Sequence, residues 1–139
     1  MNASNLVTQK LLKKAKSYLH NTYAPYSKIR VVAVLETEKG IFIGTNIENA
    51  SYSLTICAER TAFFKAISEG ARRFYRILIY SPDIIPYPCG ACRQVMSEFV
   101  DDDFEVIICS ENKKPILLRF AELFPYRFSI SETYGAEYG

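Results

Sequence analysis

Apolar residues recur with a helical period in three long segments of the chain. In residues 5–19 they fall on one side of a helix, with lysines around the rest. Residues 57–69 indicate a second helix, which Gly70 would end from the C-cap position. Residues 90–99 place apolar side chains at i, i+3, i+4 and i+7, the pattern of a helix that faces a core. A short last helix is expected over residues 120–124.

Between these helices lie runs that favour strands. Residues 29–35 and 41–45 are rich in β-branched side chains and are joined by a polar turn around Lys39 and Gly40, which predicts a hairpin. Residues 75–80, 104–109 and 116–118 read as further strands. The order of elements implies a sheet covered by helices on its faces, an α/β architecture.

The length and composition fit one globular domain. The chain has 139 residues, 49% of them hydrophobic and 23% charged, and no linker-like stretch interrupts it. We therefore expect a single domain over residues 1–139. Such a chain can bury a core without disulfides.

The charge and hydropathy of the chain indicate which kinds of partner it can bind. The formal net charge is +2, and opposite charges are mostly interspersed, which argues against a nucleic-acid partner. The lysines of residues 10–16 read as a solvated helix face. No apolar window of about 18 residues exists, so we expect no membrane partner and a cytoplasmic protein. In a reducing compartment, the four cysteines are better explained as ligands, catalytic groups or core residues than as disulfides.

Two cysteine motifs carry the candidate chemistry. One runs from Cys57 to Glu59, and the other includes Cys89 and Cys92 in a Pro-Cys-x-x-Cys pattern. All three cysteines stand at expected helix starts, where the helix dipole favours a thiolate. Three thiolates can hold one zinc ion per chain and leave its fourth position open, as catalytic zinc requires.

Two residues beside the first cysteine have expected roles. Glu59 follows the ligand Cys57 by two positions, so its carboxylate can reach a zinc-activated water and a substrate and shuttle protons between them. Arg60 could hydrogen-bond to a ligand sulfur and withdraw part of the charge that three thiolates donate. The single histidine, His20, reads as a residue near a helix end.

Other readings of the cysteines remain open at this point. Cys109 could be the fourth ligand of a closed structural zinc, although it also ends an apolar run in which a free cysteine is ordinary core filling. A Cys-x-x-C pair alone could be redox-active. The upstream ligand-x-Glu motif has no place in that chemistry.

Several stretches together resemble the small homotetrameric cytidine deaminases over nearly the whole chain, and the ligand-x-Glu and Pro-Cys-x-x-Cys pair is the signature of zinc deaminases. The stretches are residues 24–27, 44–52, 57–62, 68–70 and 88–94. The resemblance implies a three-layer α/β/α sandwich with a mixed five-stranded sheet. It also implies hydrolysis of free cytidine and 2′-deoxycytidine to uridine and 2′-deoxyuridine, as in pyrimidine salvage, with release of ammonia.

The resemblance assigns substrate contacts as well. Asn46 and Glu48 would hydrogen-bond the ribose hydroxyls, and Ala58 would lie among the substrate-binding residues. Tyr52 would reach toward a sugar in a neighbouring subunit, and Phe128 would stack on a base across the interface of a homotetramer with shared active sites.

The chain departs from the family pattern after Ser27. Ile29 stands where the family usually has an aromatic ring, so an aliphatic side chain would contact the base. Val32 stands where the family has a glycine that lets the backbone approach closely.

Rival functions are a zinc protein whose site only holds the fold, a deaminase of nucleic acid, and a deaminase of another aminopyrimidine such as a nucleoside antibiotic. The low net charge and the Asn46-x-Glu48 pattern favour a free nucleoside over nucleic acid.

Overall fold

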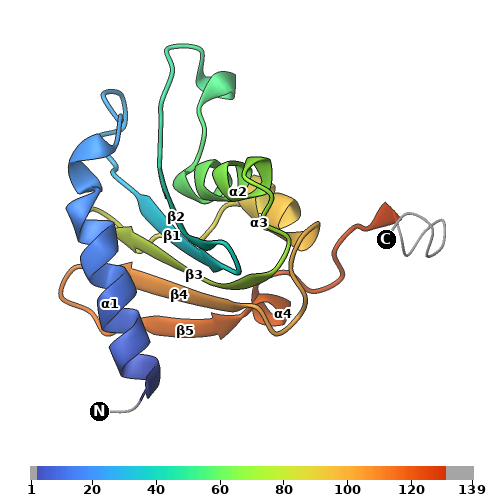
Figure 1. The fold of residues 1–139 in the computed structure, drawn as a ribbon. Coiled ribbons are helices and arrows are strands. Elements are labelled where there is room, and N and C mark those ends of the chain that lie inside the picture. Colours follow the sequence, from blue (N-terminus) through green and yellow to red (C-terminus); the bar gives the residue numbers. More distant parts are fainter. Residues whose placement is uncertain (1–2, 131–139) are drawn as a thin grey trace.

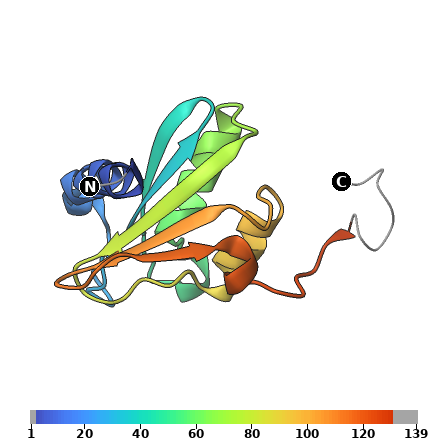
Figure 2. The ribbon, with the colours of Figure 1, turned by 90° about the horizontal axis from the view of Figure 1, so that it is seen from below.

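A five-stranded β-sheet separates two layers of helices in the computed structural model, which describes residues 3–130 (Figures 1 and 2). In chain order the elements are α1 (Ala3–Ser17), the 3₁₀ turn η1 (Leu19–Asn21), β1 (Val32–Thr37), β2 (Gly40–Thr45), η2 (Tyr52–Leu54), α2 (Ala58–Ser68), β3 (Phe74–Ser81), α3 (Gly90–Ser97), β4 (Glu105–Ser110), β5 (Ile116–Arg119) and α4 (Phe120–Leu123). Within the described residues, no helix has the length and apolar character needed to span a bilayer.

The sheet is mixed, with the strand order β2-β1-β3-β4-β5. Its neighbouring strands are antiparallel except β3 and β4, which run parallel with Leu78 paired to Ile107. A parallel pair needs a crossover connection, and here α3 lies within it. This crossover carries the second cysteine motif to the face of the sheet that α2 also covers.

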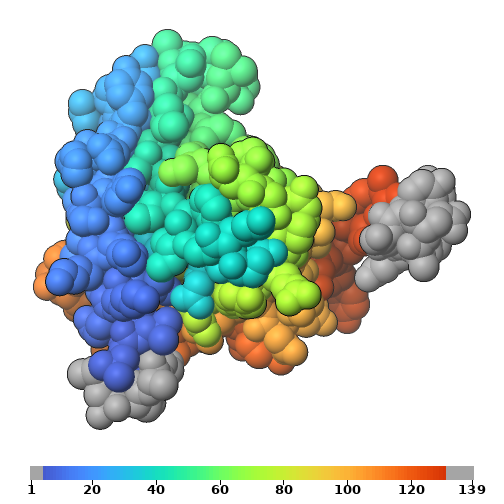
Figure 3. All heavy atoms as spheres, in the orientation of Figure 1, coloured from blue at the N-terminus to red at the C-terminus, as the bar shows by residue number. Residues whose placement is uncertain are grey.

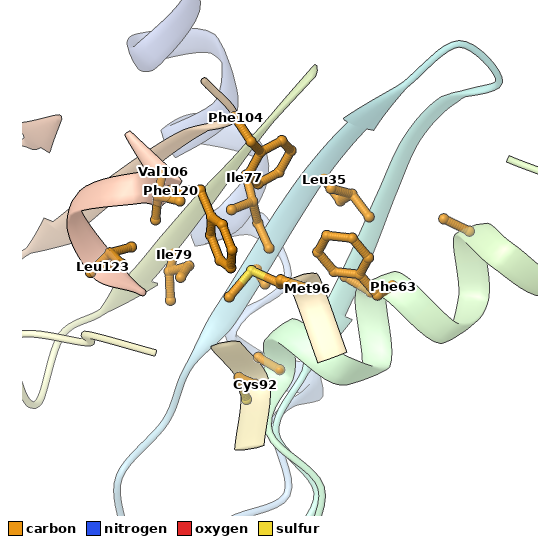
Figure 4. Close-up of a cluster of buried hydrophobic side chains, with 14 of the residues drawn as sticks. Leu35, Phe63, Ile77, Ile79, Cys92, Met96, Phe104, Val106, Phe120 and Leu123 are labelled. Atoms are coloured by element: carbon orange, nitrogen blue, oxygen red, sulfur yellow. The ribbon is translucent and has the colours of Figure 1, made fainter. Parts of the chain in front are cut away.

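Alternation along the central strands sorts the core into two clusters. Ala33 and Leu35 of β1 pack toward α2 and α3, whereas Val32 and Val34 pack toward α1. Figure 4 shows the α2/α3-side cluster, where Cys92 lies near Met96 at one end of the group. The three-layer α/β/α sandwich with a mixed five-stranded sheet, expected from the resemblance, is therefore confirmed.

The first strand begins later than the sequence pattern suggests. Residues 29–31 were expected to belong to it, but β1 begins at Val32. Lys28 takes a left-handed conformation (φ 66°), and the side chain of Asn46 bonds the backbone on both sides of Arg30 in place of a neighbouring strand. Val32 also points away from α2, so its side chain packs on the α1 side of the sheet.

The predicted end of the second helix is confirmed. Helix α2 ends at Ser68, and Gly70 follows with φ +93°. The amide of Ala71 then donates to the carbonyl of Ala66, which closes the helix in the manner of a Schellman motif.

A glycine in β2 allows α2 to lie unusually close to the sheet. A Cβ atom on Gly44 would lie 2.4 Å from the carbonyl oxygen of Ala58 and 2.4 Å from the amide nitrogen of Ala62. Both contacts are with backbone atoms, so no side chain can rotate out of the way. This close approach fixes the N-terminal turn of α2, from which the first cysteine motif projects.

Candidate metal centre

Three cysteine sulfurs converge at the starts of two helices. Cys57 is the N-cap residue of α2, Cys89 is the N-cap residue of α3, and Cys92 follows within the first turn of α3. The Sγ atom of Cys89 lies 3.8 Å from that of Cys57 and 3.4 Å from that of Cys92, and all three sulfurs lie within 4.8 Å of one another. Sulfurs bound tetrahedrally to one zinc at 2.3 Å are about 3.8 Å apart, so the donor set fits that ion.

The fourth cysteine lies elsewhere. Cys109 is on β4, 2% exposed, and packs in the α1-side cluster, on the opposite face of the sheet from Cys92. Burial raises the pKa of its thiol to about 11, as expected of a protonated core residue. The interpretation of Cys109 as the fourth ligand of a closed structural zinc site is therefore wrong.

The surroundings favour a thiolate at Cys57. Hydrogen bonding with the Cys92 thiol and then with Arg60 lowers the pKa of Cys57 to about 5. The Arg60 guanidinium donates to the Cys57 sulfur at 3.3 Å, which is the contact suggested by the sequence. Its position allows Arg60 to offset part of the negative charge at the three sulfurs.

Glu59 is enclosed beside the cysteines. Glu59 is only 4% exposed, and burial raises the pKa of its carboxyl group to about 7. A carboxyl group with a pKa near neutral can both accept and release a proton at physiological pH. The environment of Glu59 thus suits a proton shuttle.

A pocket of about 260 Å³ opens beside the cysteines. It is lined by Ser27, Ile29, Val31, Asn46, Glu48, Thr55, Ile56, Cys57, Ala58, Glu59, Ile84, Pro86, Tyr87 and Cys89. The fold thus brings Ile29, Asn46, Glu48 and Ala58 to the same space as Glu59. Sequence reasoning missed the apolar lining from residues 84–87, because that loop has no periodicity and its Pro-rich composition signals only a connection.

Asn46 and Glu48 are both anchored to the backbone around the pocket. The Oδ1 atom of Asn46 accepts from the Val31 amide at 3.0 Å, and its Nδ2 atom donates to the Ile29 carbonyl at 2.7 Å. Glu48 accepts from the amides of Tyr26 (2.9 Å) and Ser27 (3.1 Å) and from the Ser27 hydroxyl. An amide and a carboxylate have bonding capacity beyond these contacts, so both can also meet a polar ligand.

These contacts also set the charge of Glu48. The Ser27 hydroxyl, followed by the two backbone amides, holds the pKa of this carboxyl below its ordinary value. The pocket therefore presents an ionised acceptor at neutral pH.

Two expected substrate contacts lie outside this pocket. Tyr52 is 75% exposed, stands edge-on to the Tyr26 ring at 6.0 Å, and lines an adjoining hollow with Glu48. Phe128 is 64% exposed and lies beyond α4, on a segment that leads away from the body of the molecule (Figures 1 and 3). Neither ring lines the pocket of its own chain, and their roles in a neighbouring subunit stay predictions.

Comparisons with known proteins agree on one family. The family model described as the cytidine and deoxycytidylate deaminase zinc-binding region matches residues 6–109. A cytidine deaminase of Sporosarcina psychrophila is 42% identical over 93% of this chain and 97% of its own length. One of Halalkalibacterium halodurans is 43% identical over 89% and 96%. The crystal structure of cytidine deaminase from Burkholderia pseudomallei has a TM-score of 0.81 and 38% identity, covering 92% of this chain and 100% of that one.

Proposed function

Because the chain belongs to the cytidine and deoxycytidylate deaminase family with a zinc-binding region, we propose that it hydrolyses the exocyclic amine of free cytidine and 2′-deoxycytidine. The products are uridine or 2′-deoxyuridine and ammonia. The chain is a zinc-dependent hydrolytic deaminase with one zinc per chain, and Cys57, Cys89 and Cys92 are its proposed ligands.

One observation carries the proposal. A single pocket adjoins two of the cysteines and Glu59 and also contains Asn46 and Glu48. Asn46 and Glu48 supply hydrogen-bonding groups suited to a sugar diol, and the apolar side chains between suit the faces of a base. This combination favours a free nucleoside over a polymer.

The proposed chemistry combines the zinc with one carboxyl group. When bound, zinc lowers the pKa of a water molecule toward about 7 and so supplies hydroxide at neutral pH. Glu59 accepts the proton released from the water and delivers it to ring nitrogen 3, which makes carbon 4 more electrophilic. The hydroxide oxygen then bonds to carbon 4 as the double bond between carbon 4 and nitrogen 3 opens. Glu59 takes the remaining proton from the hydroxyl now on carbon 4 and passes it to the amine; the bond from carbon 4 to the amine breaks, the carbonyl forms and ammonia leaves.

The other residues bind and orient the substrate. Asn46 and Glu48 hold the ribose, while Ala58 and Ile29 contact the nucleoside within the pocket. Arg60 offsets the charge at the sulfurs.

The substitution Glu59→Gln tests the mechanism. The amide keeps the shape of the side chain but cannot accept and return a proton, so turnover should fall by about 100-fold to 10,000-fold while zinc content is unchanged. Glu69→Gln, at the exposed C-terminal end of the same helix, is the matched control and should leave turnover unchanged. Near-normal turnover of a zinc-replete Glu59→Gln variant would contradict the proposal.

The substrate class is tested with the parent chain. Absorbance is followed in parallel with cytidine, 2′-deoxycytidine, deoxycytidine monophosphate and adenosine. Turnover of the first two supports the proposal, whereas turnover of the monophosphate alone would point to a nucleotide deaminase. A zinc-replete chain that turns over none of them would support the purely structural zinc site.

The exposed rings motivate a proposal about assembly. We propose a homotetramer in which Tyr52 and Phe128 complete the site of a neighbouring chain. Their exposure in the single chain, 75% and 64%, supports this arrangement, because large aromatic side chains are usually covered in a finished assembly.

A location is proposed on the state of the cysteines. All four are free thiols in the structure, and three of them must act as thiolate ligands. This supports a reducing compartment such as the cytoplasm. A role in pyrimidine salvage is proposed on the deamination of free nucleosides alone.

A further inference from the structure

One wall of the pocket is a short segment that belongs to no strand. Ile29 and Val31 line the pocket, while β1 begins only at Val32. On one side the segment is held by Asn46, which bonds the Ile29 carbonyl and the Val31 amide. The amide of the residue between them, Arg30, is left for another partner.

Asp83 is that partner. One carboxylate oxygen accepts from the Arg30 amide at 2.9 Å and from Arg30 Nε at 3.0 Å, and the other accepts from the same guanidinium at 2.9 Å. The guanidinium also holds the pKa of the Asp83 carboxyl below its ordinary value. A bidentate pair reinforced by a backbone amide has a defined geometry, unlike most exposed ion pairs.

Asp83 itself is fixed to the end of a central strand. The hydroxyl of Ser81, a fully buried residue at the end of β3, accepts from the amides of Asp83 (3.0 Å) and Ile84 (3.3 Å). Ile84 lines the pocket, and the same loop continues through Tyr87 to Cys89. The Arg30–Asp83 pair therefore joins two pocket-lining segments that lie 53 residues apart in the sequence.

We propose that Arg30 and Asp83 are positioning residues that fix the apolar wall formed by Ile29 and Val31. The inference rests on the proposed function, because the base of the nucleoside is what this wall would contact. Neither residue is among those that line the pocket, so the pair acts through the wall. Its loss should weaken nucleoside binding equally in the ground state and the transition state, which raises KM and spares kcat.

A double-mutant cycle tests the proposal. Asp83→Ala and Arg30→Ala should each raise KM for cytidine about tenfold, the scale of an impaired apolar contact, with kcat within about twofold and zinc content unchanged. The double variant should be about as impaired as Asp83→Ala alone, because that substitution already removes every bond of the link, whereas Arg30→Ala leaves the bond from the Arg30 amide to Asp83. Arg30→Lys should recover part of the loss, since one charged donor remains.

A distant ion pair provides the matched control. Asp103 faces Arg119 at 3.5 Å with 85% of its side chain exposed, away from the pocket. Asp103→Ala should leave KM unchanged. Hydrogen exchange supplies a readout independent of turnover, because the Arg30 amide should exchange faster in Asp83→Ala and not in Asp103→Ala.

Several results would overturn the positioning role. They are an unchanged KM, strictly additive effects of the two substitutions, a parallel fall in kcat and zinc content, or unchanged exchange at the Arg30 amide. If the parent chain fails to deaminate cytidine, the proposed function fails instead. The exchange comparison then decides whether the pair holds the wall.

Discussion

Replacing Gly44 by alanine should push α2 away from the sheet and so disturb the metal centre. The new Cβ atom would lie 2.4 Å from two backbone atoms of α2, about 1 Å short of an ordinary contact between non-bonded atoms. The neighbours Ala58 and Ala62 are fully buried and already small, so nothing in the contact can be trimmed. The helix must move away from β2 by roughly that distance.

The displacement has an expected cost in stability and in catalysis. Overpacking of this kind costs about 1 to 3 kcal/mol. Helix α2 carries Cys57 and Glu59, whereas α3 carries Cys89 and Cys92, so a shift of α2 alone pulls the two halves of the site apart. A 1 Å misplacement of catalytic groups lowers turnover on the order of 100-fold. Zinc should also bind less tightly.

The assay compares two glycine variants. Denaturant unfolding, kcat with cytidine and zinc content are measured for Gly44→Ala and for Gly90→Ala, whose new Cβ would meet nothing within 4 Å. Gly90 lies between two proposed ligands, so the control is nearer to the metal in the sequence but sterically open. Parent-like stability and turnover in Gly44→Ala would refute the reasoning.

Three further predictions concern the metal, acid stability and assembly. Cys109→Ala should retain about one zinc per chain, while alanine at any of the three clustered cysteines should not, as metal analysis would reveal. Because the pKa of Glu48 is lower in the folded chain than in the unfolded chain, the ionised carboxylate stabilises the fold. This stabilisation is complete above the pKa of the unfolded state, about 4.3, and is lost as the pH falls through the pKa of the folded state. Ser27→Ala should therefore reduce the acid sensitivity of unfolding between pH 6 and 3, and an unchanged pH profile would contradict this account. Phe128→Ala should raise KM without loss of zinc, and mixing it with Glu59→Gln chains should restore some activity; an active monomer in sedimentation would exclude shared sites.

The chemistry of the site was accessible from the sequence because its residues cluster in short motifs at helix starts. The spacing of Cys89 and Cys92 within one helical turn predicts converging sulfurs, and the structure brings them together with Cys57. The helix and strand order was equally readable from periodicity. A local sequence pattern is enough to predict features whose geometry is set within one helix or strand.

Other features depend on pairings that no local pattern encodes. The late start of β1 follows from the bonds of Asn46 to residues 29 and 31, far along the chain from it. The Arg30–Asp83 pair spans a longer gap of 53 residues, and each residue alone reads as an exposed charge. The exclusion of Cys109 required the sheet register, which decides the face on which a strand residue lies.

The division of the core by the sheet has a consequence for protein engineering. Side chains such as Leu11, Ala15 and Val34 pack between the sheet and α1, with the whole sheet between them and the proposed ligand Cys92. Repacking this side can therefore raise thermal tolerance with little effect on turnover, since substitutions at well-separated sites contribute independently. Substitutions on the opposite side of the sheet should affect turnover, because the residues that stabilise α2 there also position Cys57 and Glu59.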